Sequence, residues 1–506
     1  MKYLLGIDLG TTGLKAALFD VDGALRGKGY APNSYLPGPQ GWAEQDPRAW
    51  WAGCCQAIRA AVAEARIAAA DIAGISVCGF HHCPVFLDPD GAPARPTMIT
   101  HDSRLPESLA DLRRQGIAAE IERLSGSIVT IGHFPPIYHY LLRHERQTLD
   151  QTRWMLSAKD YLRFELTGKI GTEICDATGT HLIAMPEQQW SPALCSLLDV
   201  PQAKLPEIAL SSSIAGELSP QAARATGLRA GTPVAYGGGD SHCALLGLGV
   251  IGSAEIGLLL GTNSTLRASF QGFTPSTGDY IVWKQQHVVP GWFTASASSM
   301  AGSSVLAWFE ERFCQEFDGK DAAQAYQALE AAAEAVKPGC DGLLFHPYLY
   351  GERSPFYNPN ARGSFLAAAY WHTKGHFVRS VMEGVAFCIA NCFDALQDMA
   401  RQRQECIRTI RIGAGGGGQS TLWKQIIADV LALPLDIMQA EEPGCLGAAL
   451  LAGVGVGIYR DLQEAVQRAV HLHARTLPDT TSTAIYQERR TVFNKTFQAL
   501  EPLIYR

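Results

Sequence analysis

The sequence predicts an α/β protein built from two similar lobes. Short apolar segments with a strand pattern alternate with longer segments typical of helices, which is the order found in α/β folds. Residues 6–12 read Gly-Ile-Asp-Leu-Gly-Thr-Thr, and residues 257–263 read Gly-Leu-Leu-Leu-Gly-Thr-Asn. Because these two segments lie roughly half a chain apart, they indicate a duplicated architecture. The length of 506 residues accommodates two large lobes.

The first lobe is expected to open with two strands, Tyr3–Asp8 and Leu14–Asp20, joined by a turn that contains two glycines. The segment 46–66 has a helical pattern, with an aspartate at the N-cap and a proline directly after it. Ile72–Cys78 is expected to be the next strand. A lobe boundary is expected near residue 245, which gives lobes of residues 1–245 and 246–506.

The composition is that of an ordinary globular protein. A net charge of −7 argues against nonspecific nucleic-acid binding, and 47% hydrophobic residues argue against global disorder. The 13 cysteines lack Cys-x-x-Cys spacing, which fits reduced thiols. The N-terminus has no apolar signal-peptide core, and the longest apolar stretch is too short for a membrane span. We therefore expect a cytoplasmic protein without a membrane or nucleic-acid partner.

The turn Gly10-Thr11-Thr12-Gly13 is a candidate phosphate site. Glycines let backbone amides approach an anion, and threonine hydroxyls add donors. Asp8, at the end of the preceding strand, could hold Mg²⁺ through water, and Lys15 would add a positive charge. An ordinary hairpin with a solvated lysine is the alternative.

The second copy of this turn favours phosphate binding. Gly261 and Thr262 repeat the glycine–threonine pair after an apolar strand, so two hairpins could face one polyphosphate from opposite lobes. The two copies differ at one informative position, where Leu259 stands in place of Asp8. Because the acid is present in only one copy, we expect it to have a function specific to that lobe. There is no Walker-type loop.

Asp240 is the candidate general base. It follows Gly237-Gly238-Gly239 and precedes a helix-compatible run, so the helix dipole would favour its ionised form. The glycines are expected to leave bare backbone that a substrate could approach, and the carboxylate could accept a hydroxyl proton during phosphoryl transfer. A plain N-cap aspartate is the alternative.

A second glycine run lies between a strand at 409–413 and a helix at 422–431. It includes Gly415 and Gly416 and ends at Ser420. Such a run at a helix entrance suits a flat ligand or a phosphate lying on the backbone, and a flexible loop is the alternative.

Polar side chains follow the third strand of the first lobe. His81 and His82 come directly after it, and Asp102 follows further along. Side chains at strand ends often line the ligand crevice of α/β proteins, so these could bind a polyol. A metal site is the alternative, but no third ligand at a telling spacing is apparent.

These motifs together resemble the FGGY carbohydrate kinases of the actin-like ATPase superfamily, over essentially the full chain. The order and spacing of the pieces carry the resemblance; they are residues 6–12, 42–47, 237–240, 261–262, 376–383, 415–420 and 444–449. The resemblance implies two actin-like (ribonuclease H-like) lobes with a deep cleft, and transfer of the γ-phosphoryl group of ATP, with Mg²⁺, to a sugar or polyol.

The resemblance also implies roles for individual residues. Asp240 would be the general base, and Asp8 would assist Mg²⁺. The sugar would be held by His82, Asp102 and Asp240, with His81 beside them. The nucleotide would contact residues at four elements, namely Gly10, Thr11, Thr12, Lys15, Gly261, Thr262, Gly415, Gly416 and Ser420.

Within this family the chain looks most like the xylulokinases. His82 carries over from their Gly-Gln-Met-His-Gly motif, whereas His81 replaces the methionine. Thr100 replaces a tryptophan before Asp102, and Ile137 and Tyr140 replace a lysine and a tryptophan of the first family signature. These departures all fall on the sugar side, so we expect kinase chemistry with an altered substrate pocket.

D-Xylulose is the first substrate to consider, with gluconate, erythritol or another polyol as alternatives. Two other classes remain, an actin-like ATPase that works as a conformational module and an inactive sugar-binding relative. Asp8 and Asp240 argue against the inactive relative. A homodimer is a compatible assembly.

Glycine accounts for 50 of the 506 residues, above the usual share of about 7%. Eleven of these glycines lie in the elements assigned to phosphate, adenosine or the reacting hydroxyl. We therefore expect the excess to leave backbone bare around a nucleotide.

Overall fold

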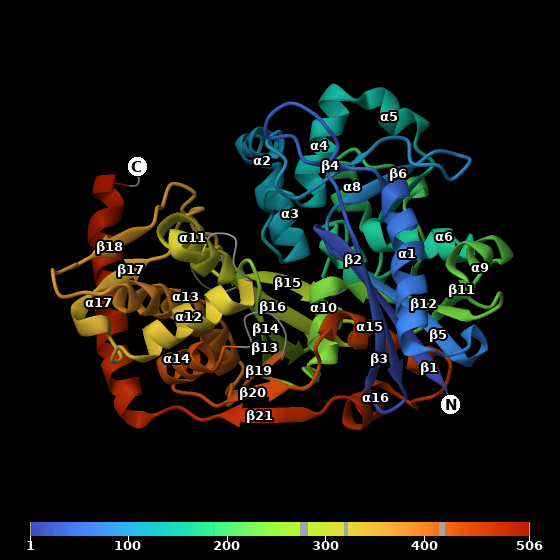
Figure 1. Cartoon of the computed structure of the whole chain (residues 1–506). Helices are drawn as coiled ribbons and strands as arrows, with labels where there is room; N and C mark the ends of the chain where they lie inside the picture. Colours follow the sequence, from blue (N-terminus) through green and yellow to red (C-terminus); the bar gives the residue numbers. More distant parts are fainter. Residues whose placement is uncertain (1, 186, 274–281, 318–321, 414–419, 505–506) are drawn as a thin grey trace.

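The computed structural model describes residues 2–185, 187–273, 282–317, 322–413 and 420–504. It contains two large β-sheets, each flanked by helices; the blue-to-green half of the chain builds one, and the yellow-green-to-red half builds the other (Figure 1). The two-lobe α/β architecture expected from the sequence is confirmed. No helix of the described residues is long and apolar enough to cross a membrane.

The first sheet has six strands. In spatial order they are β11 (Ile214–Glu217), β12 (Pro233–Gly239), β5 (Ile72–Gly79), β1 (Tyr3–Leu9), β2 (Gly13–Asp20) and β3 (Leu25–Pro32). β1 pairs antiparallel with β2 and parallel with β5. The three strands predicted for this region are therefore present, each within one residue of its predicted ends.

The second sheet has seven strands. In spatial order they are β15 (Trp283–Gln286), β16 (Trp292–Ser299), β14 (Ser264–Gln271), β13 (Glu255–Leu260), β19 (Ile410–Gly413), β20 (Leu435–Met438) and β21 (Leu472–Thr476). β13 is antiparallel to β14 and parallel to β19, which repeats the arrangement of β1 with β2 and β5. The sequence echo between residues 6–12 and 257–263 therefore marks a repeated sheet.

Helices cover both faces of the first sheet, with α1 (Pro47–Ala65) and α6 (Ala158–Thr167) on one face and α15 (Pro443–Gly455) on the other. α1 packs on β2 and β3, with Asp46 as its N-cap and Pro47 at its first position, as predicted. α6 packs on β5 and β12. The other helices of this half are α2 (Leu105–Arg114), α3 (Ile117–Ser125), α4 (Phe134–His144), α5 (Arg146–Gln151), α7 (Ile174–Gly179), α8 (Pro192–Leu197) and α9 (Pro220–Thr226). α2, α3 and α4 share a small apolar core at the top of Figure 1.

The second sheet packs on a long central helix, α13 (Lys374–Gln402), which is buried along most of its length. The other helices around it are α11 (Ser303–Phe313), α12 (Ala322–Glu334), α14 (Thr421–Leu431) and α17 (Thr480–Ile504). α16 (Leu462–Ala469) packs instead on α15, beside the first sheet. Four short strand pairs complete the fold, namely β4 (Glu44–Gln45) with β7 (Thr97–Met98), β6 (Pro84–Leu87) with β8 (Trp154–Ser157), β9 (Thr172–Glu173) with β10 (Ile208–Ala209), and β17 (Leu344–His346) with β18 (Ser364–Leu366).

Two helices join the lobes. α10 (Asp240–Gly247) packs against α15 (Pro443–Gly455), and α15 also covers β1 and β5 of the first sheet. The contacts are close because glycines leave room for backbone: a Cβ on Gly6 would lie 1.8 Å from the carbonyl O of Cys445, and one on Gly447 would lie 1.8 Å from that of Cys243. The first residues of α10 and α15 are thereby fixed between the sheets.

Candidate functional site

A cleft with a volume of about 330 Å³ lies between the two sheets. The ends of β1, β13 and β19 line it, together with the first residues of α10 and α15. The polar groups in its lining include Asp8, Lys15, Asp240 and Glu442. Gly261 and Leu259 also line it. Four residues singled out from the sequence therefore line the same cleft, namely Asp8, Lys15, Asp240 and Gly261. They come from both lobes.

Asp240 begins α10 and presents its carboxylate to the cleft. The N-cap position is taken by Gly239, so the plain N-cap alternative does not apply to Asp240. Its Oδ1 accepts a hydrogen bond of 2.5 Å from the backbone N–H of Ser241, and its side chain is 38% exposed. An accessible carboxylate at a helix N-terminus can accept a proton from a bound hydroxyl.

Asp8 lies on the same wall of the cleft. Its Oδ1 is buried and has no hydrogen-bond partner within the described residues. Burial, with a smaller contribution from the nearby charge of Asp240, raises the pKa of Asp8 to about 7. Asp8 and Asp240 are thus two carboxylates that repel each other, and one oxygen of Asp8 has no partner. Mg²⁺ prefers oxygen ligands, so these carboxylate oxygens suit it.

Lys15 is not the isolated cation that the sequence suggests. Its Nζ lies 2.6 Å from Glu442, the residue before α15, which ties the hairpin of the first sheet to the helix that joins the lobes. Burial opposes the charge of Lys15, but the hydrogen bond to Glu442 outweighs it and raises the lysine pKa. Sequence reasoning missed Glu442, which lies more than 400 residues away along the chain.

The first hairpin turn is held rigid by its own backbone. The amide of Gly10 donates to the carbonyl O of Gly13 over 2.9 Å. The carbonyl O of Thr11 accepts from Gln45 Nε2 over 2.8 Å, while the side chain of Thr12 is exposed. This geometry presents the threonine end of the turn to solvent, and phosphate binding there stays a prediction.

The second hairpin turn is similarly braced and open. The carbonyl O of Gly261 accepts from both the amide and the hydroxyl of Ser303, and that of Thr262 accepts from the hydroxyl of Ser304 over 2.6 Å. No atom lies within 4 Å of the position that a Cβ on Gly261 would occupy. Of the two turns, this one has the barer backbone.

The expectation that the glycine excess bares backbone for a nucleotide is wrong for the run before Asp240. A Cβ would lie 1.8 Å from Val77 O at Gly237, 2.4 Å from a Val288 methyl at Gly238, and 1.7 Å from the His81 ring at Gly239. Gly6 and Gly13 are covered in the same way. These glycines admit the protein's own atoms, so they serve packing.

The glycine run after β19 falls on residues 414–419, so Gly415 and Gly416 lie outside the described residues. Ser420 is the N-cap of α14, where its Oγ accepts from the Trp423 amide over 3.0 Å and donates to Glu330 over 2.7 Å. It is buried. Its proposed proximity to adenosine stays a prediction.

The first lobe contains a group of stacked histidines, which includes His82, a residue expected to bind the sugar. The ring of His82 stacks on that of His133 with a centroid distance of 4.1 Å, and His133 stacks on His181 at 4.8 Å. Burial lowers the pKa of all three, so they are neutral at physiological pH. His82 Nδ1 lies 2.7 Å from the carbonyl O of Gly179, so Nδ1 carries the proton and Nε2 is an acceptor.

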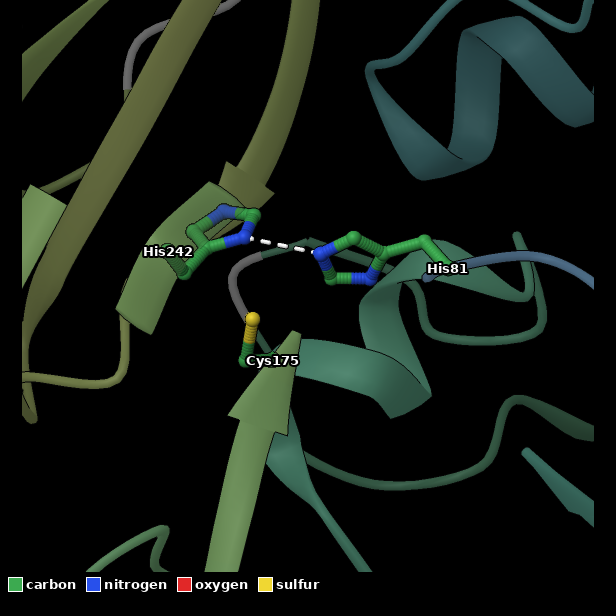
Figure 2. Close-up of side chains that lie close together, drawn as sticks. All are labelled: His81, Cys175 and His242. Carbon is green, nitrogen blue, oxygen red and sulfur yellow. Dashed lines mark hydrogen bonds between the residues drawn. The ribbon is translucent and has the colours of Figure 1, made fainter. Parts of the chain in front are cut away.

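His81 is the centre of a hydrogen-bond chain that crosses between the lobes. Figure 2 shows its ring pointing toward that of His242, with 3.0 Å between His81 Nε2 and His242 Nδ1. On its other side, His81 Nδ1 lies 2.8 Å from Asp176 Oδ1. Arg267 donates to His242 Nε2 over 2.8 Å.

Further contacts hold His242 between the two lobes. Arg267 Nη1 also lies 3.3 Å from His242 Nδ1, and His242 Nε2 lies 2.9 Å from Thr294 Oγ1. Burial would raise the pKa of Asp176, but the charge of Lys159 and the bond from His81 hold it below its usual range. His81 also lies 4.0 Å from Asp240, beside the candidate base.

The structure brings a third residue, Cys175, close to two histidines, which bears on the alternative of a metal site. The spacing of these residues in the sequence did not reveal this proximity. His81, Cys175 and His242 have ligand atoms within 4.8 Å of one another (Figure 2). However, the guanidinium of Arg267 lies 2.8 Å from His242 Nε2, and its positive charge would repel a cation bound there. Burial also raises the pKa of Cys175 well above its usual value, which disfavours the thiolate. We interpret the group as a hydrogen-bond chain.

Asp102 lies in a buried ion pair. Its oxygens accept from the side chain of Arg104, with distances of 2.7 and 2.6 Å, and from the amide of Ala43 over 2.7 Å. Burial opposes the charge of Asp102, but the bonds from Arg104 outweigh it and lower the pKa. The carboxylate is thus already engaged within the protein, and its contact with a sugar stays a prediction.

Comparison with known proteins gives a consistent result. The model for the FGGY family of carbohydrate kinases, N-terminal domain, matches residues 3–247, and the model for the C-terminal domain of that family matches residues 257–456. Xylulose kinase of Bacillus subtilis is 28% identical, with 98% of this chain and 96% of the relative covered. L-Xylulose/3-keto-L-gulonate kinase of Escherichia coli is 29% identical, with 99% and 97% covered.

The fold agrees with solved structures over the whole chain. The crystal structure of a xyloylose kinase from Brucella ovis superimposes with a TM-score of 0.87 at 27% sequence identity, covering 99% of this chain and 100% of that one. The actin-like (ribonuclease H-like) two-lobe fold that the resemblance implied is therefore confirmed.

Proposed function

We propose, from the premise that this chain belongs to the FGGY family of carbohydrate kinases, that it transfers the γ-phosphoryl group of ATP to a hydroxyl of a small sugar in the cleft between the lobes. The observation that carries the proposal is the pair Asp8 and Asp240, which line one cleft together with Lys15 and Gly261. Phosphoryl transfer depends mainly on positioning and charge neutralisation, and this lining offers both.

Asp240 is the general base in this proposal. Its carboxylate is accessible at the start of α10 and accepts the proton of the sugar hydroxyl as that oxygen attacks the phosphorus. The amide of Ser241 holds Oδ1 in place, and His81 borders the base at 4.0 Å. His82, whose Nδ1 is engaged by the carbonyl O of Gly179, would accept another hydroxyl of the sugar at Nε2.

Asp8 is the residue that would hold Mg²⁺, together with water. A bound Mg²⁺ supplies positive charge that neutralises the phosphate oxygens during transfer. Thr11, Thr12, Gly261 and Thr262 would contact the phosphates from the two hairpin turns. Because phosphate and carboxylate would compete for Lys15, nucleotide binding is expected to weaken its pair with Glu442.

The proposed division of labour follows the two lobes. Residues 1–245 would bind the sugar and part of the phosphate, and residues 246–506 would bind the nucleotide. The substrate class contains ketopentoses, sugar acids and polyols, with D-xylulose as the reference compound because of the relatives' names. The alternative, an actin-like ATPase module, would hydrolyse ATP at full rate without sugar.

The test is a coupled ADP-release screen of the purified chain with ATP and Mg²⁺ across ketopentoses, aldonates and polyols. The proposal expects sugar-dependent release whose rate Asp240→Asn lowers by roughly 10²–10⁴, while the surface variant Asp90→Asn keeps it. Asp8→Ala is expected to reduce Mg²⁺-dependent turnover more than sugar binding. Full turnover without any sugar would favour the ATPase module, and no turnover with any compound would refute the proposal.

A further inference from the structure

A buried polar surface lies on one face of the second sheet, at the edge that meets the first lobe. Arg267 of β14, Ser296 of β16 and Trp283 of β15 stand opposite one another across the three strands. The next row on the same face contains Ser269, Thr294 and Gln285, two residues further along each strand. Sheet faces packed inside a protein are ordinarily apolar, so this face needs an explanation.

Most of these side chains carry buried polar atoms that lack a partner within the described residues. The donors without an acceptor are Arg267 Nε, Trp283 Nε1 and Gln285 Nε2, and the hydroxyls without a partner are those of Ser269 and Ser296. Unsatisfied buried donors are costly, and natural proteins seldom keep several together. Because three of the five atoms only donate, the group that would satisfy them is rich in acceptor oxygens.

Arg267 adds a positive charge that forms no salt bridge within the described residues. It is only 8% exposed, and the charge of Asp240 acts on it only from beyond salt-bridge distance. Its hydrogen bonds go to the neutral partners His242, Gln285 and Thr294. Burial lowers the pKa of Arg267 to about 10, which reflects how poorly this position solvates the guanidinium. A buried cation without a counter-ion is the expected partner of an anionic ligand.

The surface is connected to the candidate base through the side chains of His242 and His81. Arg267 contacts His242, His242 contacts His81, and His81 borders Asp240, with separations of 2.8, 3.0 and 4.0 Å. Gly179 sits where the two lobes meet and is closely packed: a Cβ there would be 3.0 Å from Gln285 Nε2, 3.4 Å from His81 Nδ1 and 3.5 Å from His82. In Figure 2, His242 lies beside strands of the second sheet and His81 beside α7, the helix that contains Cys175.

We propose that Arg267, with the donors of Gln285 and Trp283, binds the carboxylate of a sugar acid, so that the substrates of this kinase are small aldonates. The contacts from Asp176 through His81 and His242 hold Arg267 in place, and its guanidinium supplies a positive charge at the site. This proposal rests on the kinase function proposed above, but the carboxylate subsite can be measured without phosphoryl transfer.

The first experiment compares acids and neutral alcohols of equal length by titration calorimetry on the full chain without nucleotide. The probes are D-gluconate against D-glucitol, and D-xylonate against xylitol. A charge-assisted contact to a buried guanidinium is expected to make each acid roughly 10- to 100-fold tighter than its alcohol. Equal affinities within each pair would overturn the proposal.

Two variants test the positive charge of the subsite, one by deleting it and the other by neutralising it. Arg267→Met deletes the guanidinium, and Gln285→Glu supplies an internal carboxylate at the atom that now lies 3.2 Å from Arg267 Nη1. Both should abolish the preference for acids and leave the affinity for the alcohols within about threefold, since only the acid uses that charge. Gln271→Glu, the same charge change at the exposed end of β14, is the matched control.

The outcomes separate the subsite from the kinase function. Tight binding of the acids that Gln285→Glu removes, without their phosphorylation, would support the subsite and count against the proposed function. Phosphorylation of D-xylulose with no measurable affinity for either acid would support the kinase function and overturn the carboxylate subsite. If Arg267→Met does not fold, Gln285→Glu decides; an unchanged acid preference in that variant would overturn the carboxylate subsite.

Discussion

Replacing the buried carboxylate of Asp8 by an amide should stabilise the unliganded protein, and more so at high pH. The fold raises the pKa of Asp8 from 3.8 to about 7. At about 1.4 kcal/mol per pKa unit, the ionised carboxylate therefore costs the folded state about 4 kcal/mol once the pH exceeds 7. Asn cannot ionise, so Asp8→Asn removes this cost.

The sign of the pH dependence follows from which state binds the proton. Below pH 3.8 both states keep it and Asp8 costs nothing; between 3.8 and 7 only the folded state keeps it, so stability falls as the pH rises. The stabilisation by Asp8→Asn should therefore be about 2 kcal/mol at pH 5.5 and about 4 kcal/mol at pH 8.5.

Urea unfolding of the metal-free protein at both pH values measures this directly. Asp90→Asn, a substitution in an exposed turn, is the control and should change stability little at either pH. A gain from Asp8→Asn that is the same at pH 5.5 and 8.5, or a loss at pH 8.5, would refute the reasoning that Asp8 is held protonated by burial.

Three further predictions concern the cleft. Asp240→Asn should lower kcat by roughly 10²–10⁴ while the sugar KM changes little, as steady-state ADP release would reveal; near wild-type turnover would contradict its role. Gly239→Ala should destabilise the protein by about 1–3 kcal/mol in urea unfolding, since its Cβ would lie 1.7 Å from the His81 ring, and His81→Ala should restore much of the loss. Lys15→Met breaks a half-exposed pair with Glu442, so stability should change by under about 1 kcal/mol while the KM for ATP rises; an unchanged KM would exclude a phosphate contact.

The sequence predicted the fold well because the signals were local. Strand ends, the Asp46 N-cap and the repeated Gly-Thr turns are encoded within a few residues, and each matches the structure. Asp8 and Asp240 could be singled out because each stands at the end of a strand or the start of a helix, where side chains reach a cleft.

The rest depended on contacts between distant segments. Nothing around Arg267 in the sequence marks it as functional, since its burial arises only when β14 meets α10 and β15. His242, only two residues after Asp240, was visible but carried no signal until His81 came within 3.0 Å. Glu442 likewise gained significance only through Lys15.

The glycines show most clearly which features follow from the sequence and which follow only from the tertiary structure. The sequence by itself determined where they cluster, and hence which turns and helix entrances build the cleft. Only the tertiary structure decided their purpose: Gly237, Gly238 and Gly239 are filled by Val77, Val288 and His81, whereas Gly261 is open. A glycine makes space, but the segments that fold against it determine whether protein or ligand occupies that space.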